Sequence, residues 1–465
     1  MTFRSHDYCI VGAGPAGLTL AYHLVQAGQR VVMIERDARA GGLAKSYNYE
    51  GHIFDTGPKR FHTDDPIVQD FIKEAGQMET IGRSTLVHFT GRYFNWPLTS
   101  KELIKLPVLT SFNAALDLLR KKGHLDPQSF SDFIRGQYGE TLYQLFFRPY
   151  TQKFLRWDPE DIHADWASTG INRTVIDKRV KANSLFDLLR SLALPSKIET
   201  EFLYPATGGF GGFFDRLLAF CQDSGLFELV TSDTLTSLED TGATMHARTA
   251  GGRELTFDTL VWSGNVKDIG RLVSGAEYDV HFINTVFFNL ICREGSVGPN
   301  RAQWIYVSRG DSLVSRITCM KEFSPANSPA GYYNFICEVT DSQAAPRYMQ
   351  QPKQFTDEVI NEMLRMGFLR DRRGVEAVHI NPVMDTYPIY HRHYHKGFGS
   401  VLGAVKKFSP RIHLLGRSGA YWYNNSDHSI RMAIDMSHKL LRDPEQNFDF
   451  RAYFGGSARE DSGQD

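Results

Sequence analysis

The segment from residue 8 to residue 42 constrains the fold more than any other part of the chain. An apolar run at residues 8–11 precedes glycines in G-x-G-x-x-G spacing, a helix-like segment, and a second apolar run that ends at Glu35. Short apolar runs bounded by glycines are typical of buried strands. The order strand, glycine turn, helix, strand and acid predicts a dinucleotide-binding fold: the backbone approaches a pyrophosphate at a helix N-terminus, and the acid accepts from a ribose hydroxyl.

The same segment indicates which dinucleotide is bound. A glycine pair follows six and seven residues after Glu35, and Pro-Ala lies inside the fingerprint. Both features resemble the FAD-binding proteins of the glutathione-reductase-like superfamily, and an extended FAD needs more closely approaching backbone than a shorter ligand. We therefore expect FAD, held here by Gly12, Gly14, Pro15, Ala16, Gly17, Glu35, Arg36, Gly41, Gly42 and Leu43.

Composition narrows the class of protein further. The 52 basic and 53 acidic residues nearly cancel, so no global charge recruits nucleic acid or an acidic membrane. The five cysteines are scattered and form no C-x-x-C pair, which indicates buried thiols in a reducing compartment and neither a zinc site nor a redox disulfide. No apolar run reaches transmembrane length, and the first apolar run is broken by glycines, unlike a signal peptide. We expect a cytoplasmic enzyme without membrane insertion.

The chain is long enough for two or three domains. Helical spacing in the region before residue 198, with Ser129 or Ser131 and Asp158 as helix starts, predicts a helical insertion. Alternation at period two between residues 280 and 339 predicts an antiparallel sheet. The predicted fold class is α/β, a FAD-binding Rossmann-like domain with these two additions. Its predicted parts are the FAD domain (1–98, 199–275 and 401–446), the helical domain (99–198), the sheet domain (276–400) and a disordered tail (447–465).

Two stretches leave their role open from the residues alone. The loop at residues 57–63, rich in basic and aromatic residues, is either a surface loop or a cover for the flavin. Arg316 shares a strand face with Val314 and Thr318, so it marks either a sheet edge in solvent or an anion site. Near the C-terminus, a strand at residues 412–415 leads through an aromatic turn to Ser426-Asp427. These two residues are expected to cap a long helix whose N-terminus favours negative charge on a reduced flavin.

A run of further motifs resembles the UDP-galactopyranose mutase family. The matching segments follow one another over nearly the whole chain: Phe61-His62-Thr63, NWPL at 95–98, LYQLFFRPYTQK at 142–153, Ala164-Asp165-Trp166-Ala167, Arg173, Ser315-Arg316-Ile317, Thr386-Tyr387-Pro388 and GRSGAYWYNNSDHSI at 416–430. The resemblance implies that reduced FAD acts as a covalent catalyst through N5. The enzyme would convert a nucleoside-diphosphate sugar between pyranose and furanose forms in the biosynthesis of cell-surface polysaccharide.

The resemblance also implies roles for individual residues. Arg173 and Arg316 match the arginines that clamp the diphosphate, a task that suits the planar guanidinium fork. The implied catalytic residues are His62, Arg173, Arg316, Tyr387 and Tyr423. The implied substrate-binding residues are Tyr150, Lys153, Arg173, Tyr204, Arg316, Tyr387, Tyr423 and Asn425. Further cofactor contacts are expected from Gly57, Arg60, Phe61, His62, Gly416, Arg417, Asn425, Ser426 and Asp427. We also expect that an external reductant such as NAD(P)H reduces the flavin and that the protein forms a homodimer.

The chain departs from the family pattern at three positions, Lys59, Leu155 and Asn425, all of which sit where the sugar or its nucleotide would be touched. These departures bear on the identity of the substrate more than on the type of reaction. A second hypothesis is a FAD-dependent oxidase or desaturase of the amine-oxidase or protoporphyrinogen-oxidase-like group. A third is a flavin-binding scaffold without turnover. The arginine pair discriminates between the first two hypotheses, because an apolar substrate has no use for buried cations.

Overall fold

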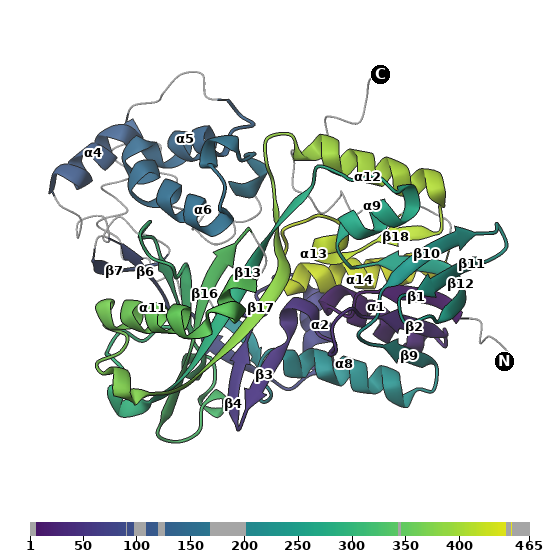
Figure 1. Cartoon of the computed structure of the whole chain (residues 1–465), viewed down its shortest axis with the longest axis horizontal. Coiled ribbons are helices and arrows are strands. Elements are labelled where there is room, and N and C mark those ends of the chain that lie inside the picture. Colours follow the sequence, from purple (N-terminus) through teal and green to yellow (C-terminus); the bar gives the residue numbers. More distant parts are fainter. Residues whose placement is uncertain are drawn as a thin grey trace.

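The computed structural model describes residues 6–89, 91–96, 108–119, 126–167, 201–342, 346–442 and 448. Two seven-stranded sheets lie side by side in this part of the chain, and a group of helices rests above the second sheet (Figure 1). The predicted fold class is confirmed, with a nucleotide-binding sheet, an antiparallel sheet and a helical part. None of the described helices combines the length and the apolar character that a membrane crossing requires.

The first sheet is the nucleotide-binding sheet. Its parallel strands are β1 (His6–Val11), β2 (Val31–Ile34), β9 (Phe227–Val230), β12 (Glu254–Trp262) and β18 (Ile412–Leu414), and β10 (Leu235–Asp240) and β11 (Met245–Thr249) are antiparallel additions. The segment at 258–264, predicted to return to this sheet, does so beside β1. Helix α1 (Pro15–Gln26) packs against α8 (Gly211–Asp223) and α14 (Ser426–Leu440). Strand β1 is almost wholly buried, as a parallel strand covered on both faces should be.

The second sheet contains all the strands predicted from period-two alternation. Its order is β17 (Val375–Ile389), β13 (His281–Arg293), β16 (Tyr332–Asp341), β15 (Arg316–Cys319), β14 (Trp304–Val307), β6 (Thr85–Phe89) and β7 (Arg92–Asn95). Strands β6 and β7 differ from the predicted division, which gave residues 1–98 to the FAD domain. They extend the second sheet instead, because β6 pairs in parallel with β14, a partner more than 200 residues away in sequence.

The described α-helices between residues 99 and 167 include α4 (Val108–Leu119), α5 (Phe130–Leu142) and α6 (Arg148–Leu155), with a π-helical turn between the last two. Ser129 caps α5, since its hydroxyl accepts from the Asp132 backbone N–H at 3.3 Å. Asp158 caps a 3-10 turn at Pro159–Asp161 in the same way. Both predicted starts are confirmed, and the remainder of the predicted helical domain, residues 168–198, lies outside the described residues.

The remaining elements lie outside the two large sheets. They are α2 (Pro66–Ala75), α9 (Val266–Ser274), α10 (Pro346–Gln350), α11 (Pro352–Arg365), α12 (Tyr394–Phe408), α13 (Gly416–Gly419), the pair β3 (Ser46–Tyr49) and β4 (His52–Asp55), and the pair β5 (Met78–Gly82) and β8 (Glu201–Pro205). The helix predicted to be capped by Ser426-Asp427 is α14. Its N-cap is Asn425, so the two predicted capping residues instead form the first turn. Apart from Phe448, the predicted tail lies outside the described residues.

Candidate functional site

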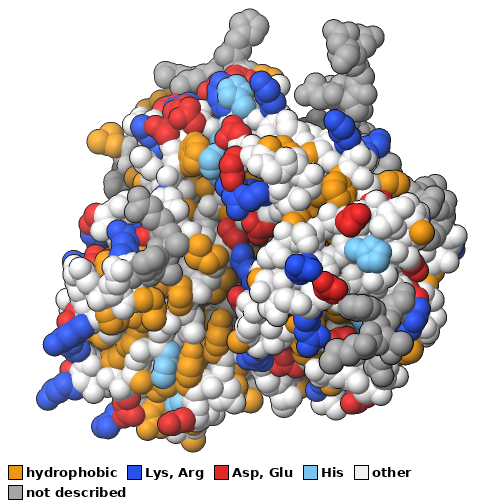
Figure 2. Space-filling view, turned by 45° about the vertical axis from the view of Figure 1, so that its right-hand side comes forward, with side chains coloured by type: hydrophobic (Ala, Val, Ile, Leu, Met, Phe, Trp, Pro, Cys, Tyr) orange, Lys and Arg blue, Asp and Glu red, His pale blue; other side chains and the backbone are white. Residues whose placement is uncertain are grey.

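A cavity of about 660 Å³ opens at the carboxyl ends of β1, β2, β9 and β12. Its lining includes residues from the fingerprint turn, the loop after β9, the turn after β12 and the start of α14. Acidic and basic side chains gather near the middle of the molecular face in Figure 2, where the surface is hollowed. Carboxyl ends of parallel strands are the usual place for a ligand in an open α/β sheet, and the volume suits a small organic ligand.

The fingerprint glycines are required by close backbone contacts. A Cβ on Gly17 would lie 2.1 Å from the Gly12 carbonyl oxygen, and one on Gly42 would lie 2.8 Å from the Cα of Gly14. Gly12 and Gly41 also have positive φ angles, 101° and 116°. Side chains at these positions would push the turn and the glycine pair apart. The two predicted glycine groups therefore form one surface, from which Gly12, Gly14 and Gly42 face the cavity.

Glu35 lies at the end of β2, as predicted, and lines the cavity. Its carboxylate accepts from the Ala13 backbone N–H at 2.7 Å and from the Asp37 N–H at 3.0 Å. These bonds fix the buried carboxylate between the fingerprint turn and the following loop, with acceptor capacity left for a hydroxyl. Arg36 lines the same region and pairs with Asp385 at 3.1 Å.

The predicted C-terminal residues approach the cavity from the opposite side. Asn425 and Ser426 line it at the N-terminus of α14, where unpaired backbone N–H groups carry partial positive charge. Arg417 also lines the cavity, and its guanidinium donates to the carbonyl oxygens of Thr386 and Asn424. The ring centroids of Tyr387 and Tyr423 lie 5.1 and 5.2 Å from this guanidinium.

Arg316 lies in an interior strand of the second sheet, so it is not at a sheet edge. Its Nε and Nη2 donate to the two oxygens of Glu338 at 2.7 and 2.6 Å, and Nη2 also donates to the Tyr387 hydroxyl at 3.1 Å. The Glu338 side chain is fully buried. Burial would lower the pKa of Arg316, but Glu338 holds it well above its ordinary value. The reading of Arg316 as a solvent-facing edge residue is therefore wrong, and the cation is permanently charged.

Gly57 places the loop of residues 57–63 against this ion pair. A Cβ at Gly57, where φ is 86°, would lie 2.7 Å from the Glu338 Oε1 and 3.4 Å from the Arg316 Nη2. The next residue but one, Lys59, reaches the cavity. Burial, with the nearby charges of Arg417 and Arg316, lowers the pKa of Lys59 to about 7. The loop thus joins the cavity to the arginine of the second sheet and is not a detached surface loop.

Aromatic side chains surround the guanidinium of Arg316. The Tyr423 ring stacks on Trp166 with centroids 4.9 Å apart and meets Tyr387 edge to face at 5.2 Å. Tyr150, from α6, lies edge to face with Tyr306 of β14 at 5.8 Å. Tyr306 is directly opposite Arg316 in the sheet. The predicted tyrosines at 150, 387 and 423 therefore converge on one region, to which the helical part contributes two rings.

Several predicted contacts are placed differently by the structure. The ammonium of Lys153 donates to the carbonyl oxygens of Val307, Arg309 and Val314 at 2.5 to 2.9 Å, so its three donors are used within the fold. Tyr204 is fully buried and donates to Asp55 at 2.7 Å. The polar groups of both residues are satisfied by the chain itself, and neither lines the cavity.

The remaining predicted residues support the site or lie near it. Phe61 packs into the aromatic core against Phe210, at 4.5 Å between ring centroids. The His62 side chain reaches the surface. Partial desolvation of its imidazole ring, together with the charges of Arg60 and Arg83, lowers its pKa. Gly416 and Asp427 are buried behind the cavity wall, and Leu155, a departure from the family pattern, is buried in α6. Arg173 lies outside the described residues.

Sequence reasoning missed two groups of site residues. The first group lines the cavity because it follows β9 and β12 at the carboxyl edge of the sheet, and consists of Asp233, Thr234, Ser263 and Gly264. Knowledge of the strand order would have predicted these positions. Glu338 was also missed. Glu338 lies directly opposite Arg316 in the pairing of β15 with β16, and this register identifies it as the partner of that arginine.

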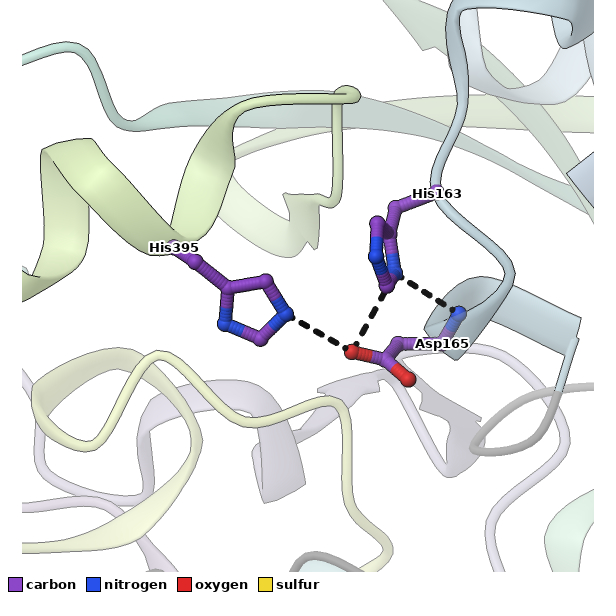
Figure 3. A group of neighbouring side chains, drawn as sticks. All are labelled: His163, Asp165 and His395. Carbon is purple, nitrogen blue, oxygen red and sulfur yellow. Dashed lines mark hydrogen bonds and ion pairs between the residues drawn. The ribbon is translucent and has the colours of Figure 1, made fainter. Parts of the chain in front are cut away.

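A histidine-rich junction fastens the helical part to the first turn of α12. The Asp165 Oδ2 lies 3.2 Å from both the His163 Nδ1 and the His395 Nε2 (Figure 3). It also accepts from the Tyr394 hydroxyl at 2.6 Å. Burial alone would raise the pKa of Asp165, but these hydrogen bonds hold it well below its usual range. The cluster joins the segment that carries Trp166 to the first turn of α12, and so fixes the ring that stacks on Tyr423.

Comparisons with known proteins agree with this geometry. Residues 10–75 match the model of the NAD(P)-binding Rossmann-like domain. A probable UDP-galactopyranose mutase of Klebsiella pneumoniae is 28% identical over 172 residues, 35% of this chain and 44% of the relative. A dTDP-fucopyranose mutase of Escherichia coli is 28% identical over 166 residues, 33% of this chain and 43% of the relative. The chain thus matches less than half the length of these curated relatives.

Solved structures extend the likeness in fold to the whole chain. A reduced UDP-galactopyranose mutase superposes with a TM-score of 0.79 at 19% identity, covering 94% of this chain and 96% of the other. A putrescine oxidase bound to putrescine gives a TM-score of 0.60 at 14% identity, over 94% and 99% of the two chains. The fold and the cavity define a protein of the class that carries a Rossmann-like dinucleotide-binding domain. Within that class, the resemblance to the UDP-galactopyranose mutase family is confirmed.

Proposed function

We propose that this protein is a flavin-dependent mutase that interconverts the pyranose and furanose forms of a nucleoside-diphosphate sugar. The observation that carries the proposal is the buried, permanently charged Arg316 beside a cavity suited to a dinucleotide. Glu338 already pairs with the Nε and Nη2 side of this cation, and the Nη1 side that remains can donate to a diphosphate, whereas an apolar substrate offers it no acceptor. The sequence similarity to two mutases of nucleotide sugars supports the same substrate class.

The cavity lining fits FAD. Gly12, Gly14 and Gly42 offer bare backbone for a pyrophosphate, and Glu35 keeps acceptor capacity for a ribose hydroxyl. Asn425 and Ser426 bring the positive end of α14 to the other end of the cavity. When bound and reduced, FAD supplies a nucleophilic nitrogen for the anomeric carbon of the sugar. Bound nucleophiles of this kind replace one difficult displacement by two easier ones.

The residues of the second sheet would hold the departing diphosphate. Glu338 takes the Nε and Nη2 face of Arg316, which fixes the plane of the guanidinium and leaves its Nη1 side for a phosphate oxygen. Tyr387 and Tyr423 would bound the sugar, and Tyr150 would stack on the base. Arg173 would supply the second cation of the clamp by its match to the family. Held in this way, the diphosphate remains close enough to return after the ring has reclosed.

The alternative is a FAD-dependent oxidase or desaturase, which the likeness in fold to a putrescine oxidase favours. The two functions differ in the redox state they need. A mutase works only with reduced flavin and shows no net oxidation, whereas an oxidase reduces its flavin with substrate and then passes electrons to an acceptor.

The test is to incubate the dithionite-reduced protein with UDP-galactopyranose or dTDP-fucopyranose and to separate the products by liquid chromatography. We expect a furanose product from at least one of them, and none from the oxidised protein. Arg316→Lys keeps the charge but not the fork, and should retain more turnover than Arg316→Ala. The mutase proposal fails if no nucleotide sugar perturbs the spectrum of the reduced flavin, and an amine that bleaches the oxidised flavin would establish the oxidase.

A further inference from the structure

A second pair of arginines lies on the same sheet as Arg316. The guanidinium carbons of Arg60 and Arg83 lie 4.4 and 5.4 Å from the ring centroid of Trp304, which is fully buried. Arg60 comes from the loop of residues 57–63, and Arg83 precedes β6. Two segments separated in sequence thus bring two cations over one indole. Each contact is favourable, but two like charges at one ring also repel each other.

No salt bridge joins either arginine to an acidic side chain among the described residues, although the charge of Asp427 acts on Arg60 from a longer distance. Arg83 donates from Nε to the Thr85 hydroxyl at 3.2 Å, while its Nη2 is buried without a hydrogen-bond partner. Arg60 makes only ring contacts, with Trp304 and Phe202. Burial lowers the pKa of both side chains, that of Arg60 to about 10. Half-buried Arg135, by contrast, is paired with Glu160 at 2.8 Å, so an anion would satisfy at Arg60 and Arg83 what Glu160 satisfies there.

The register of the sheet places this pair beside the proposed diphosphate site. Trp304 pairs with Thr318, and Tyr306 pairs with Arg316. Residues two apart share a face, so Trp304 and Tyr306 lie on the face that carries Arg316, about 7 Å apart along β14. Tyr306 acts electrostatically on both Arg60 and Arg83, and Arg316 acts on Arg60. Arg60 and Arg83 therefore lie near Arg316, over a ring on the same face of the sheet.

We propose that Arg60 and Arg83 bind a carboxylate carried by the sugar, so that the substrate is a nucleoside-diphosphate sugar acid of the hexuronic type. This inference rests on the proposed function, in which Arg316 takes the diphosphate. A carboxylate fits the pair because it accepts several charge-assisted hydrogen bonds in one plane, and the orphaned Nη2 of Arg83 gains an acceptor. A neutral hydroxymethyl group would leave two dehydrated cations unpaired.

The experiment compares two ligands that differ only at the sugar C6, UDP-galactose and UDP-galacturonic acid, by calorimetric titration of the oxidised full-length protein. We expect the acid to bind about 10- to 100-fold more tightly, the range set by charge-assisted hydrogen bonds. Arg60→Gln and Arg83→Gln should each remove most of this preference, while Arg60→Lys and Arg83→Lys should retain part of it. The dTDP forms of both sugars are titrated in parallel.

The matched control is Arg301→Gln. Arg301 also lies over an aromatic ring, Tyr333, at 5.1 Å, but it pairs with Glu294 at 3.5 Å and is exposed. This variant should keep the full preference for the acid. Melting temperature and flavin content of each variant establish that it is folded before it is titrated.

Three outcomes overturn the inference, and they separate it from the proposed function. If the neutral and acidic sugars bind equally, the carboxylate site is wrong while the mutase proposal stands. If the glutamine variants weaken both ligands by the same factor, the pair serves the diphosphate. If no ligand binds in either the UDP or the dTDP form, both proposals fall together.

Discussion

Replacing Arg316 by methionine should destabilise the protein strongly, because the change leaves the Glu338 carboxylate buried without a counterion. Glu338 is fully buried, Arg316 is about one-tenth exposed, and the two join through hydrogen bonds of 2.7 and 2.6 Å. Removing one partner of such a pair costs about 3–5 kcal/mol. Replacing both by methionine removes the uncompensated charge as well, so the double variant should recover most of the loss.

The measurement is a double-mutant cycle of wild type, Arg316→Met, Glu338→Met and the double variant, followed by thermal unfolding with tryptophan fluorescence. For the single variant Arg316→Met we expect a fall in melting temperature on the order of 10 °C. A coupling energy of about 2 kcal/mol or more should separate the sum of the single effects from the double effect. If the effects are additive, the two side chains do not stabilise each other, and the fixed guanidinium on which the proposed diphosphate site depends is refuted.

Three further predictions test other parts of the site. Gly17→Ala should purify without flavin, because its Cβ would lie 2.1 Å from the Gly12 oxygen, whereas Gly82→Ala, whose Cβ meets nothing within 4 Å, should retain flavin by absorbance. Because the pKa of Lys59 is lowered to about 7, its charge is present below pH 7 and lost above it. UDP-galactose affinity, measured by titration, should therefore fall by about 1 kcal/mol between pH 6 and 8, and not in Lys59→Met. Tyr204→Phe should cost about 1–3 kcal/mol of stability by removing a donor to buried Asp55 and leave turnover unchanged; lost turnover would restore Tyr204 to the substrate site.

The nucleotide-binding part was predictable because its signals are local. Gly12 and Gly41 have positive φ angles, which glycine adopts readily, and the run at residues 8–11 is apolar throughout. In both cases the residue type itself indicates the local structure. The strands of the second sheet were predictable for the same reason, since period-two alternation is a property of the segment alone. Assignment of β6 to that sheet was not predictable, because its partner β14 lies far along the chain.

Individual site residues show where local reasoning ends. Lys153 and Tyr204 have the side chains expected of ligand-binding residues, yet the fold uses them to satisfy buried carbonyl oxygens and the Asp55 carboxylate. A lysine that binds a phosphate and one that caps three carbonyls cannot be distinguished by residue type. The distinction depends on which acceptors the tertiary structure brings within reach.

By itself the sequence determined the cofactor fold and the family resemblance, because glycine spacing, apolar runs and ordered motifs are written along the chain. Only the tertiary structure decided what Arg316 faces. The register of the sheet places Glu338 opposite Arg316, and Gly57 packs against both side chains. The histidine junction at Asp165 positions Trp166, whose ring stacks on Tyr423. The fold also brought Arg60 and Arg83 over Trp304. The charge of a side chain is a property of the sequence, but whether that charge is already neutralised depends on neighbours that folding alone supplies.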